Sequence, residues 1–223
     1  MAGCEAPLWG LLLIWSTDCE PYVYIDGFNL YYGALKANRA LHWLNVDALC
    51  RAYFPKSNIQ AIKYFTAKIK AKPGDLSQEQ RQNFYIRALE TIPHLSVYYG
   101  HFLSSSVRRP LSDGSGMVDV IKTEEKGSDV NIACHLLHDA HLNKFDAAIV
   151  VSNDSDLLCP IQMVRNCLHK KVGLLNPHKK PSRELLNNSD FIKSIRKGTL
   201  ASSQFPDVMT DKQGTFHRPK EWK

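Results

Sequence analysis

Four aspartates in three short motifs are the residues of this chain whose types and spacing could do chemistry. Asp26 follows the apolar run YVYI in IDGFN, and Asp154 and Asp156 follow the run AAIVV in VVSNDSD. Asp129 lies in the segment KGSDV. Carboxylates that are brought together repel each other and persist chiefly because they bind a hard cation. We therefore expect a site for Mg²⁺ or Mn²⁺, ions that activate a bound water and stabilise charge on a phosphoryl oxygen.

Each motif alone also has a simpler interpretation. Asp26 with the following glycine is typical of a turn, and Asp129 is typical of an acid in the first turn of a helix. Asp154 and Asp156 could cap the next helix. Two acids directly after a buried strand are harder to explain in this way, and the joint pattern favours a functional site.

Neutral and weakly basic groups could complete this site. Asn29 and Ser152 are expected to orient waters and to hold the carboxylates by hydrogen bonds. Glu125 is a better candidate than Glu124 for a supporting role outside the metal ligands. Five histidines offer extra acid or base groups: His94, His101, His135, His138 and His141. For the three on the helix of Asp129, packing and surface roles are the more common use.

The spacing of apolar residues predicts an α/β fold. Strands are expected at Tyr22–Ile25, Ile59–Ile69, Leu95–Leu103, Met117–Lys122, Ala147–Val151 and Lys171–Asn176. Helices are expected at Asn29–Ala37, Asn45–Phe54, Leu76–Thr91 (with Ser77 and Gln80 as a capping box), Asp129–Leu142 and Asp156–Leu168, with weakly helical pieces over Ser182–Ile195. A polar loop is expected from Ser104 to Gly116.

Alternating strands and helices predict a largely parallel sheet that is covered on both faces. In such sheets functional groups gather beyond the carboxyl ends of the strands, where the strand order reverses. If the strands that precede Asp26 and Asp154 are neighbours, the carboxylates converge, and Asp129 can join them from the start of its helix. The adjacency of these two strands is an assumption at this point.

The 223 residues, 44% of them hydrophobic, are enough for one substantial core. We expect a domain over 21–197 and a polar tail over 198–223 that is mobile or draped on the surface. The extension 1–20 is either disordered or precedes the true start. Its apolar run, Leu8 to Trp15, is too short to span a bilayer and follows an acid, so we expect a cytoplasmic protein with no membrane partner. Six cysteines without a C-x-x-C pair predict reduced thiols.

From Tyr22 to Ile195 the chain resembles the NYN family of the PIN-like nuclease superfamily, and particularly its LabA-like branch. The family's D-G-x-N motif matches Asp26, Gly27 and Asn29. Its motif K-G-x-D-V-x-[IL]-A matches Lys126, Gly127, Asp129, Val130, Ile132 and Ala133, and its motif S-x-D-x-D matches Ser152, Asp154 and Asp156. Three ordered motifs with correct flanks form a specific signal, whereas any one alone would be weak.

The resemblance implies a three-layer PIN-like fold with strand order 3-2-1-4-5, which would supply the assumed adjacency. It also implies hydrolysis of RNA with one or two divalent cations, in which Asp26, Asp129, Asp154 and Asp156 are the metal ligands and water is the nucleophile. The chain departs from many relatives in the Ser104–Gly116 insertion and in its tail, and both put the choice of substrate in doubt.

A net charge of +6 makes a polyanionic partner plausible, although mild basicity can also serve solubility alone. The candidate contacts for RNA phosphates are Lys68, Lys70, Lys72, Arg108, Arg109, Lys126, Lys179, Lys180 and Arg183. Phe28, Tyr31, Tyr32 and Phe102 are candidates for base stacking, although two or more of them are expected in the core. A homodimer is considered as a further partner.

Competing functions were weighed against the same residues. A non-catalytic RNA-binding module that keeps the metal site is the main alternative, and the presence of all four aspartates argues against it. A doubly wound phosphatase would need a nucleophilic D-x-D after the first strand, where this chain has Phe28 as the third residue. The G-x-G-x-x-G motif of nicotinamide enzymes and the P-loop are both missing.

Overall fold

The computed structural model describes residues 19–69 and 74–223. The expectations for residues 1–18, and for Lys70 and Lys72, lie outside the described residues. Within those ranges, no helix is long and apolar enough to cross a membrane.

A seven-stranded sheet, mostly parallel, forms the centre of the described chain in the order β4-β3-β2-β1-β5-β6-β7. Its strands are β1 (Pro21–Asp26), β2 (Ala61–Ala67), β3 (Leu95–Pro110), β4 (Met117–Lys126), β5 (Ala147–Val151), β6 (Lys171–Asn176) and β7 (Phe191–Ser194). The predicted α/β class is confirmed. The order 3-2-1-4-5 holds for the first five parallel strands, and the sheet is extended by parallel β7 at one edge and antiparallel β4 at the other.

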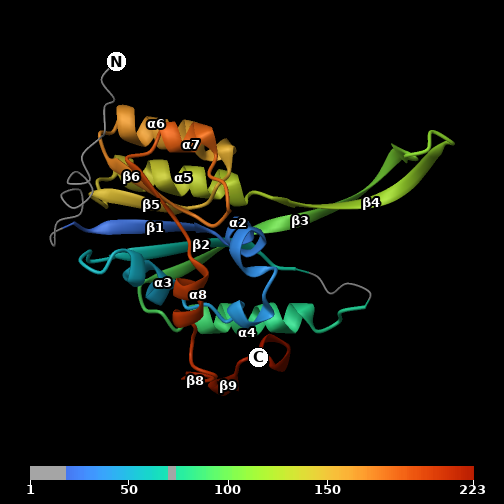
Figure 1. Ribbon diagram of the computed structural model, residues 1–223, viewed down its shortest axis with the longest axis horizontal. Coiled ribbons are helices and arrows are strands. Elements are labelled where there is room, and N and C mark those ends of the chain that lie inside the picture. The colour runs from blue at the N-terminus through green and yellow to red at the C-terminus, as the bar shows by residue number, and fades with distance from the viewer. Residues whose placement is uncertain (1–18, 70–73) are drawn as a thin grey trace.

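Helices cover both faces of this sheet (Figure 1). In chain order they are α2 (Gly27–Leu30), η1 (Tyr31–Leu35), η2 (Arg39–Leu41), α3 (Val46–Tyr53), α4 (Gln78–Leu89), α5 (Ser128–His141), η3 (Ser155–Leu157), α6 (Leu158–Asn166), α7 (Arg183–Asn187), α8 (Lys197–Ser202) and η4 (Lys220–Trp222). A small hairpin pairs β8 (Val208–Asp211) with β9 (Gly214–His217). Helices α5, α6 and α7 lie on one side of the sheet, and α3, α4 and α8 on the other.

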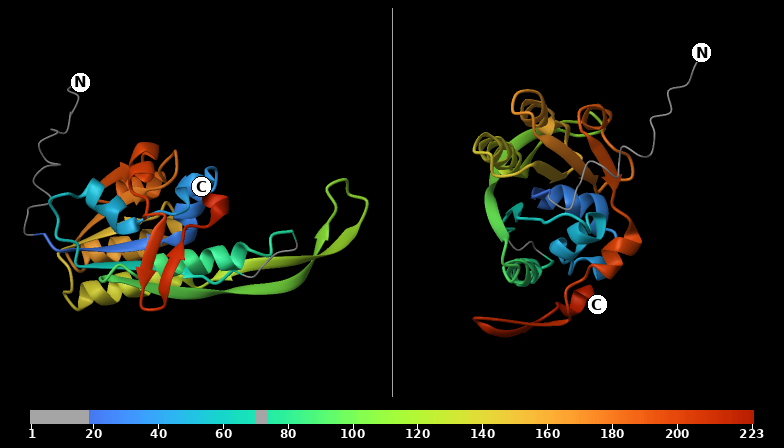
Figure 2. Two further views of the ribbon diagram at one scale, coloured as in Figure 1. Left: turned by 90° about the horizontal axis from the view of Figure 1, so that it is seen from below. Right: turned by 90° about the vertical axis from the view of Figure 1, so that its left-hand side faces the viewer.

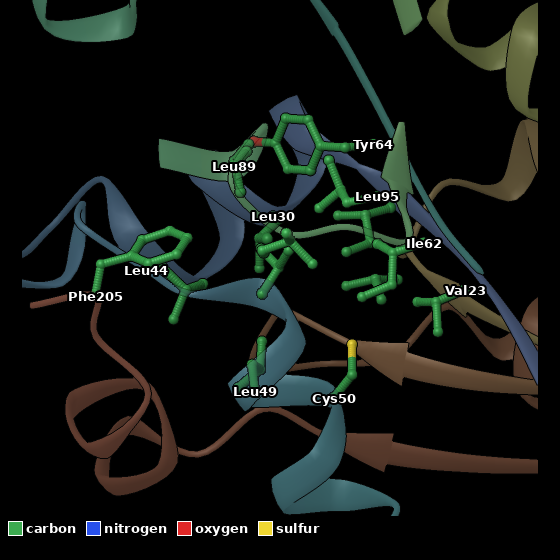
Figure 3. Packing of buried hydrophobic residues seen from close by; sticks show 14 of the residues in the cluster. Val23, Leu30, Leu44, Leu49, Cys50, Ile62, Tyr64, Leu89, Leu95 and Phe205 are labelled. Atoms are coloured by element: carbon green, nitrogen blue, oxygen red, sulfur yellow. The ribbon is translucent and has the colours of Figure 1, made fainter. Parts of the chain in front are cut away.

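The two faces carry two separate hydrophobic clusters because successive side chains of a strand point to opposite sides. Val23 and Ile25 of β1 belong to the cluster under α3 and α4, whereas Tyr24 between them belongs to the cluster under α5 and α6. Figure 3 shows part of the first cluster, where Leu30, Leu49 and Leu89 gather around the sheet. All five residues of β5 are buried, as expected for a central strand covered on both faces.

The segment Ser104–Gly116 is not a loop, and this prediction is wrong. Strand β3 continues to Pro110 and pairs with β4 from His101 opposite Lys126 to Pro110 opposite Met117, which leaves only 111–116 as the turn. This β3–β4 hairpin projects well beyond the body of the molecule (Figure 2). Most side chains of its outer part are exposed. A strand with no buried face does not need alternating apolar and polar residues, so the pattern from which strands were predicted is missing there.

The C-terminal segment is more ordered than the expected mobile or draped tail. Leu200, Phe205, Phe216 and Trp222 are buried and belong to the first hydrophobic cluster. The ring of Trp43 contacts three of these residues, and its Nε1 donates to the backbone oxygen of Pro206 at 2.8 Å. These anchors are widely spaced and enter the core singly, so they leave no periodic pattern in the sequence.

Two local predictions also need correction. The weakly helical pieces expected over Ser182–Ile195 are the short helix α7 followed by strand β7, because the second half completes the edge of the sheet. Ser77 precedes α4 but makes no side-chain cap, because its hydroxyl donates to Asp75 and accepts from Arg81 instead.

Candidate active site

Asp26 ends strand β1 and caps helix α2 at the carboxyl edge of the sheet. Its Oδ1 accepts the backbone N–H of Asn29 at 2.9 Å, which satisfies a helix N-terminus as a capping aspartate should. Its Oδ2 accepts a hydrogen bond from the Ser152 hydroxyl at 3.1 Å. The side chain is held from two directions and the residue is 4% exposed.

The second acidic motif lies beside Asp26 because β1 and β5 are neighbours. The two strands pair in parallel, with Ile25 opposite Val151, so Asp26 and Ser152 leave the sheet side by side. The assumed adjacency is therefore confirmed. Asp154 caps η3 by accepting the backbone N–H of Asp156 at 3.0 Å, as the simpler interpretation of this motif expected, while its own N–H donates to the Ser152 hydroxyl oxygen at 3.1 Å.

Asn29 and Asn153 connect this edge of the sheet to the loop after β6. The Asn29 side-chain oxygen accepts the backbone N–H of Asn153 at 3.0 Å. The Asn153 side chain then donates to the Lys180 carbonyl oxygen at 3.1 Å and accepts the Ser182 N–H at 2.7 Å. Asn153 was not among the residues predicted from the sequence. It could have been predicted from its position in a polar motif directly after a buried strand.

Asp129 enters from the first turn of α5. The turn before this helix needs Gly127, whose φ of +98° is a conformation that side chains with a Cβ rarely adopt. The Glu125 carboxylate accepts both the N–H of Ser128, at 3.1 Å, and its hydroxyl, at 2.8 Å. Glu125 thus supports the start of the helix that carries Asp129, and Glu124 pairs with Lys122 and Lys126 instead.

The carboxylates are close enough to affect one another's ionisation. Burial, together with the charges of Asp129 and Asp154, raises the pKa of Asp26 to about 6, although the hydrogen bonds from Asn29 and Ser152 lower it. Burial also raises the pKa of Asp129, together with the charges of Asp154, Glu125 and Asp156. Repulsion between like charges therefore extends over all three motifs.

The donor chemistry of this cluster fits a hard divalent cation, since carboxylate, amide and hydroxyl oxygens are the ligands that Mg²⁺ prefers. The geometry is less complete than expected. In the described part of the chain, no three His, Cys, Asp or Glu side chains are grouped so that they could hold a metal ion. The four aspartates are brought to one edge of the sheet, but they do not form a finished set of ligands.

The predicted basic residues do not gather in one place, and two groups of them can be compared. Lys179, Lys180 and Arg183 lie on the loop that Asn153 anchors beside the acidic motifs and at the start of α7. Arg108 and Arg109 lie far out on the β3–β4 hairpin, where they face Asp119 and Val118 of β4. Only the first of these groups is therefore tied directly to the acidic motifs.

The remaining predicted cations and the histidines have other surroundings. Lys68 stands 5.3 Å from the centre of the Tyr99 ring, and Lys126 pairs with Glu124. His94 contacts Asp47 at 3.0 Å, and His135 contacts Lys63 at 3.2 Å. These contacts agree with the structural use of the histidines that the sequence favoured.

A groove of about 850 Å³ begins next to Asp26, at the following residues Gly27 and Phe28. Its tyrosine, phenylalanine and tryptophan lining consists of Phe28, Tyr31, Tyr32, Tyr64, Tyr85, Phe102 and Trp222, and we call it the aromatic groove. The four aromatic residues considered for base stacking all line it. None of the four is buried, so the expectation that two or more belong to the core is wrong. Arg39 and Arg81 also line the groove, and sequence reasoning did not single them out.

Residues 22–195 match the NYN domain. The chain belongs to the NYN domain family. The match includes all three acidic motifs, so the sheet edge that carries Asp26 lies within the family domain. Membership of this family agrees with the observed fold, a mostly parallel sheet whose strand order reverses between β1 and β5.

Two further proteins are similar to this NYN chain. It is 29% identical to 6-hydroxy-3-succinoylpyridine 3-monooxygenase HspA from Pseudomonas putida over 246 aligned residues, which cover 93% of this chain and 77% of that protein. A protein of unknown function from Vibrio parahaemolyticus has a similar crystal structure, with a TM-score of 0.50 and 18% identity over 80% of this chain and 94% of that one. At that identity the second likeness shows the fold alone.

Proposed function

We propose that this NYN protein, which we place in the LabA-like branch, is a metal-dependent ribonuclease, and that Asp26, Asp129, Asp154 and Asp156 hold Mg²⁺ or Mn²⁺. The observation that carries the proposal is the buried carboxylate of Asp26. Hydrogen bonds from Asn29 and Ser152 hold this carboxylate at the point where the strand order reverses. The negative charges of Asp129 and Asp154 are near enough to raise its pKa. A buried acid with a raised pKa at such a position is typical of functional sites.

The chain's own residues would prepare the site for phosphodiester hydrolysis. Ser152 and Asn29 hold the Asp26 carboxylate in one orientation, so that little rearrangement is needed when a cation binds. The cation, when bound, would lower the pKa of a water and stabilise charge on a phosphoryl oxygen. Lys179, Lys180 and Arg183 would attract the RNA backbone to an edge that otherwise repels it.

The reaction adds water to phosphorus and breaks the bond to the 3′ oxygen, which takes up a proton. The products are therefore a 5′ phosphate and a 3′ hydroxyl. Labelled single-stranded and structured RNAs incubated with pure protein, with and without Mg²⁺ or Mn²⁺, test this proposal. Full activity in EDTA, or ends that carry a cyclic 2′,3′ phosphate, would contradict it.

Two variants separate this enzyme from a non-catalytic RNA-binding NYN module. We expect Asp26→Asn to abolish cleavage, and Asp113→Asn, in the exposed turn of the hairpin, to cleave like the parent. RNA binding without cleavage under any metal condition would favour the binding module. Cleavage that survives in Asp26→Asn would point to a contaminating nuclease.

A second candidate is monooxygenation of a pyridine compound, the activity stated by the name of the Pseudomonas relative. The aromatic groove beside Asp26 supports it, because such a groove could hold a flat ring. A monooxygenase incorporates one oxygen atom of O₂ into its substrate and reduces the other to water, so this reaction needs a two-electron donor. Oxygen uptake with 6-hydroxy-3-succinoylpyridine and a reduced nicotinamide or flavin would favour this candidate over the nuclease.

A further inference from the structure

The aromatic groove is built from parts of the chain that are far apart in sequence. Its rings come from α2 and η1 (Phe28, Tyr31 and Tyr32), β2 (Tyr64), α4 (Tyr85), the base of the β3–β4 hairpin (Phe102) and η4 (Trp222). In Figure 1 α2 lies where the hairpin leaves the sheet, with α4 below it. The groove therefore lies at the same edge as Asp26.

The rings of the groove are arranged edge to face and leave surface uncovered. Phe28 and Phe102 lie 5.8 Å apart at an angle of 79°, and Tyr31 and Tyr32 lie 5.3 Å apart at the same angle. Tyr32 is 60% exposed. Exposed aromatic surface that lines a hollow is typical of a binding site for another flat ring.

Positively charged side chains at the rim of the groove favour a ligand that also carries an anionic group. Arg81 is neutralised by Asp75 and Glu221. Lys36 and Arg39, by contrast, form no ion pair within residues 19–69 and 74–223, and the Lys36 ammonium lies 4.8 Å from the centre of the Tyr32 ring. Both cations therefore remain available for an anionic group attached to the ring.

The groove is fixed in place next to the acidic edge. Gly27 follows Asp26 and packs so tightly that an added Cβ would stand 2.7 Å from the Phe65 carbonyl oxygen and 2.8 Å from the Tyr64 ring. Helix α2 therefore cannot move away from the sheet without breaking these contacts. Phe28 is only two residues after Asp26, so a ring bound against Phe28 would lie beside the acidic edge.

We propose that the aromatic groove binds a base of single-stranded RNA adjacent to the phosphate that meets the acidic edge, with Tyr32 as a stacking surface and with Lys36 and Arg39 facing a neighbouring phosphate. This inference rests on the proposed nuclease function and names its substrate as unpaired RNA. Stacking on aromatic rings accepts every base, so the groove confers a preference for single strands and not for a sequence.

Binding in EDTA tests the groove without cleavage. A six-nucleotide RNA, AMP and ribose 5-phosphate are titrated against the full chain, and Tyr32→Leu is compared with Tyr99→Leu. Tyr99 is the matched control because its ring is 40% exposed but lies outside the groove. We expect RNA and AMP to bind roughly tenfold more tightly than ribose 5-phosphate, and Tyr32→Leu to remove that advantage while Tyr99→Leu keeps it.

Three outcomes would overturn the proposal. The first is that ribose 5-phosphate binds as well as AMP, and the second is that Tyr32→Leu binds RNA like the parent. The third is that nicotinate, a ring without a phosphate, binds more tightly than AMP and RNA. The last result would assign the groove to a small aromatic molecule. Failure of the nuclease function is distinguishable: Tyr32-dependent RNA binding without cleavage in Mg²⁺ or Mn²⁺ leaves the groove in place and removes only the hydrolysis.

Discussion

Ser152 donates a hydrogen bond from its hydroxyl to Oδ2 of Asp26, over 3.1 Å, across the boundary between strands β5 and β1. The same hydroxyl oxygen accepts the backbone N–H of Asp154 at 3.1 Å. Ser152 is 1% exposed. One buried hydroxyl therefore connects the two acidic motifs and sets the orientation of the first.

We predict that Ser152→Ala lowers metal-dependent cleavage by about 10- to 100-fold, the usual cost of losing a group that orients a metal ligand. The hydroxyl lowers the pKa of Asp26, so its removal raises that pKa and moves the acidic limb of the pH–rate profile to higher pH. Ser155→Ala, exposed in the same turn, is the control. A parental rate with an unchanged pH profile in Ser152→Ala would show that this hydroxyl has no part in the site.

A buried ion pair on the face of the sheet covered by α5 should contribute to the free energy of unfolding without taking part in the candidate active site. Lys63 pairs with Asp139, which also accepts the Tyr24 hydroxyl at 2.8 Å, and the side chains of the pair are 11% and 1% exposed. Asp139→Asn leaves the Lys63 charge without its partner, which should lower the free energy of unfolding by about 3 to 5 kcal/mol. Urea denaturation measures this change.

Glu124→Gln is the control for that experiment, because the pair of Glu124 with Lys122 is exposed and such pairs contribute about 0 to 1 kcal/mol. If Asp139→Asn destabilises the protein no more than Glu124→Gln does, the buried pair contributes little and the core of this face depends on its apolar contacts alone.

The parts of the fold that were predicted from the sequence are those with a buried face. Strands Ala147–Val151 and Lys171–Asn176 have the predicted bounds, because complete burial leaves a continuous apolar run. Helix α5 was predicted within one residue at each end, since Ile132, Leu136 and Ala140 repeat at helical spacing. The hairpin had no such signal, because its outer residues contact mainly solvent.

The candidate site was predictable in its residues but not in its contacts. The three motifs named Asp26, Asp129 and Asp154, and the pairing of β1 with β5 then brought two of the motifs together. The hydrogen bonds of Asn153, by contrast, join segments that only the folded chain places side by side. The aromatic groove has the same origin, because its rings come from five regions of the chain and share no spacing.

The loop after β6 should govern electrostatic attraction of RNA. The Asn153 side chain holds this loop beside the acidic edge, because it donates a hydrogen bond to the Lys180 carbonyl oxygen and accepts one from the Ser182 N–H. Replacing Lys179, Lys180 and Arg183 together by Ala should weaken binding similarly for all sequences and reduce the slope of log K against log salt by about 2, since each phosphate contact on a single strand contributes about 0.7.

The matched comparison replaces Arg108 and Arg109, far out on the hairpin, by Ala. Affinities of one single-stranded RNA at several salt concentrations, measured in EDTA, give the slopes. An unchanged slope for the loop variant together with a reduced slope for the hairpin variant would place the RNA along the hairpin.

The last prediction concerns Asp26 and the stability of the metal-free protein. Its folded-state pKa of about 6 lies above the ordinary value of 3.8, so the folded chain binds this proton more tightly than the unfolded chain. The parent should therefore lose stability as the pH rises from about 4 to about 6, and should carry the full penalty above that. A shift of about 2 pH units corresponds to about 3 kcal/mol at most.

Asp26→Asn removes this charge and can keep the cap on α2, because asparagine caps helices as well as aspartate does. Its weaker hydrogen bonds offset part of the gain, so we expect the variant to be more stable than the parent at pH 7 by about 1 kcal/mol and to depend less on pH between 4 and 6. Thermal melts in EDTA at several pH values measure both effects, with Asp113→Asn in the exposed turn as the control.

The same thermal melts, repeated with added metal, test whether Asp26 is a metal ligand. A ligand that binds only the folded state raises the melting temperature, so Mg²⁺ or Mn²⁺ should stabilise the parent and Asp113→Asn equally, and Asp26→Asn less. An aspartate that serves only as a helix cap predicts a different pattern: Asp26→Asn would be no more stable than the parent in EDTA, because asparagine keeps the cap, and metal would shift all three proteins by the same amount. That pattern would rule out Asp26 as a metal ligand, because a ligand cannot be removed without loss of linkage.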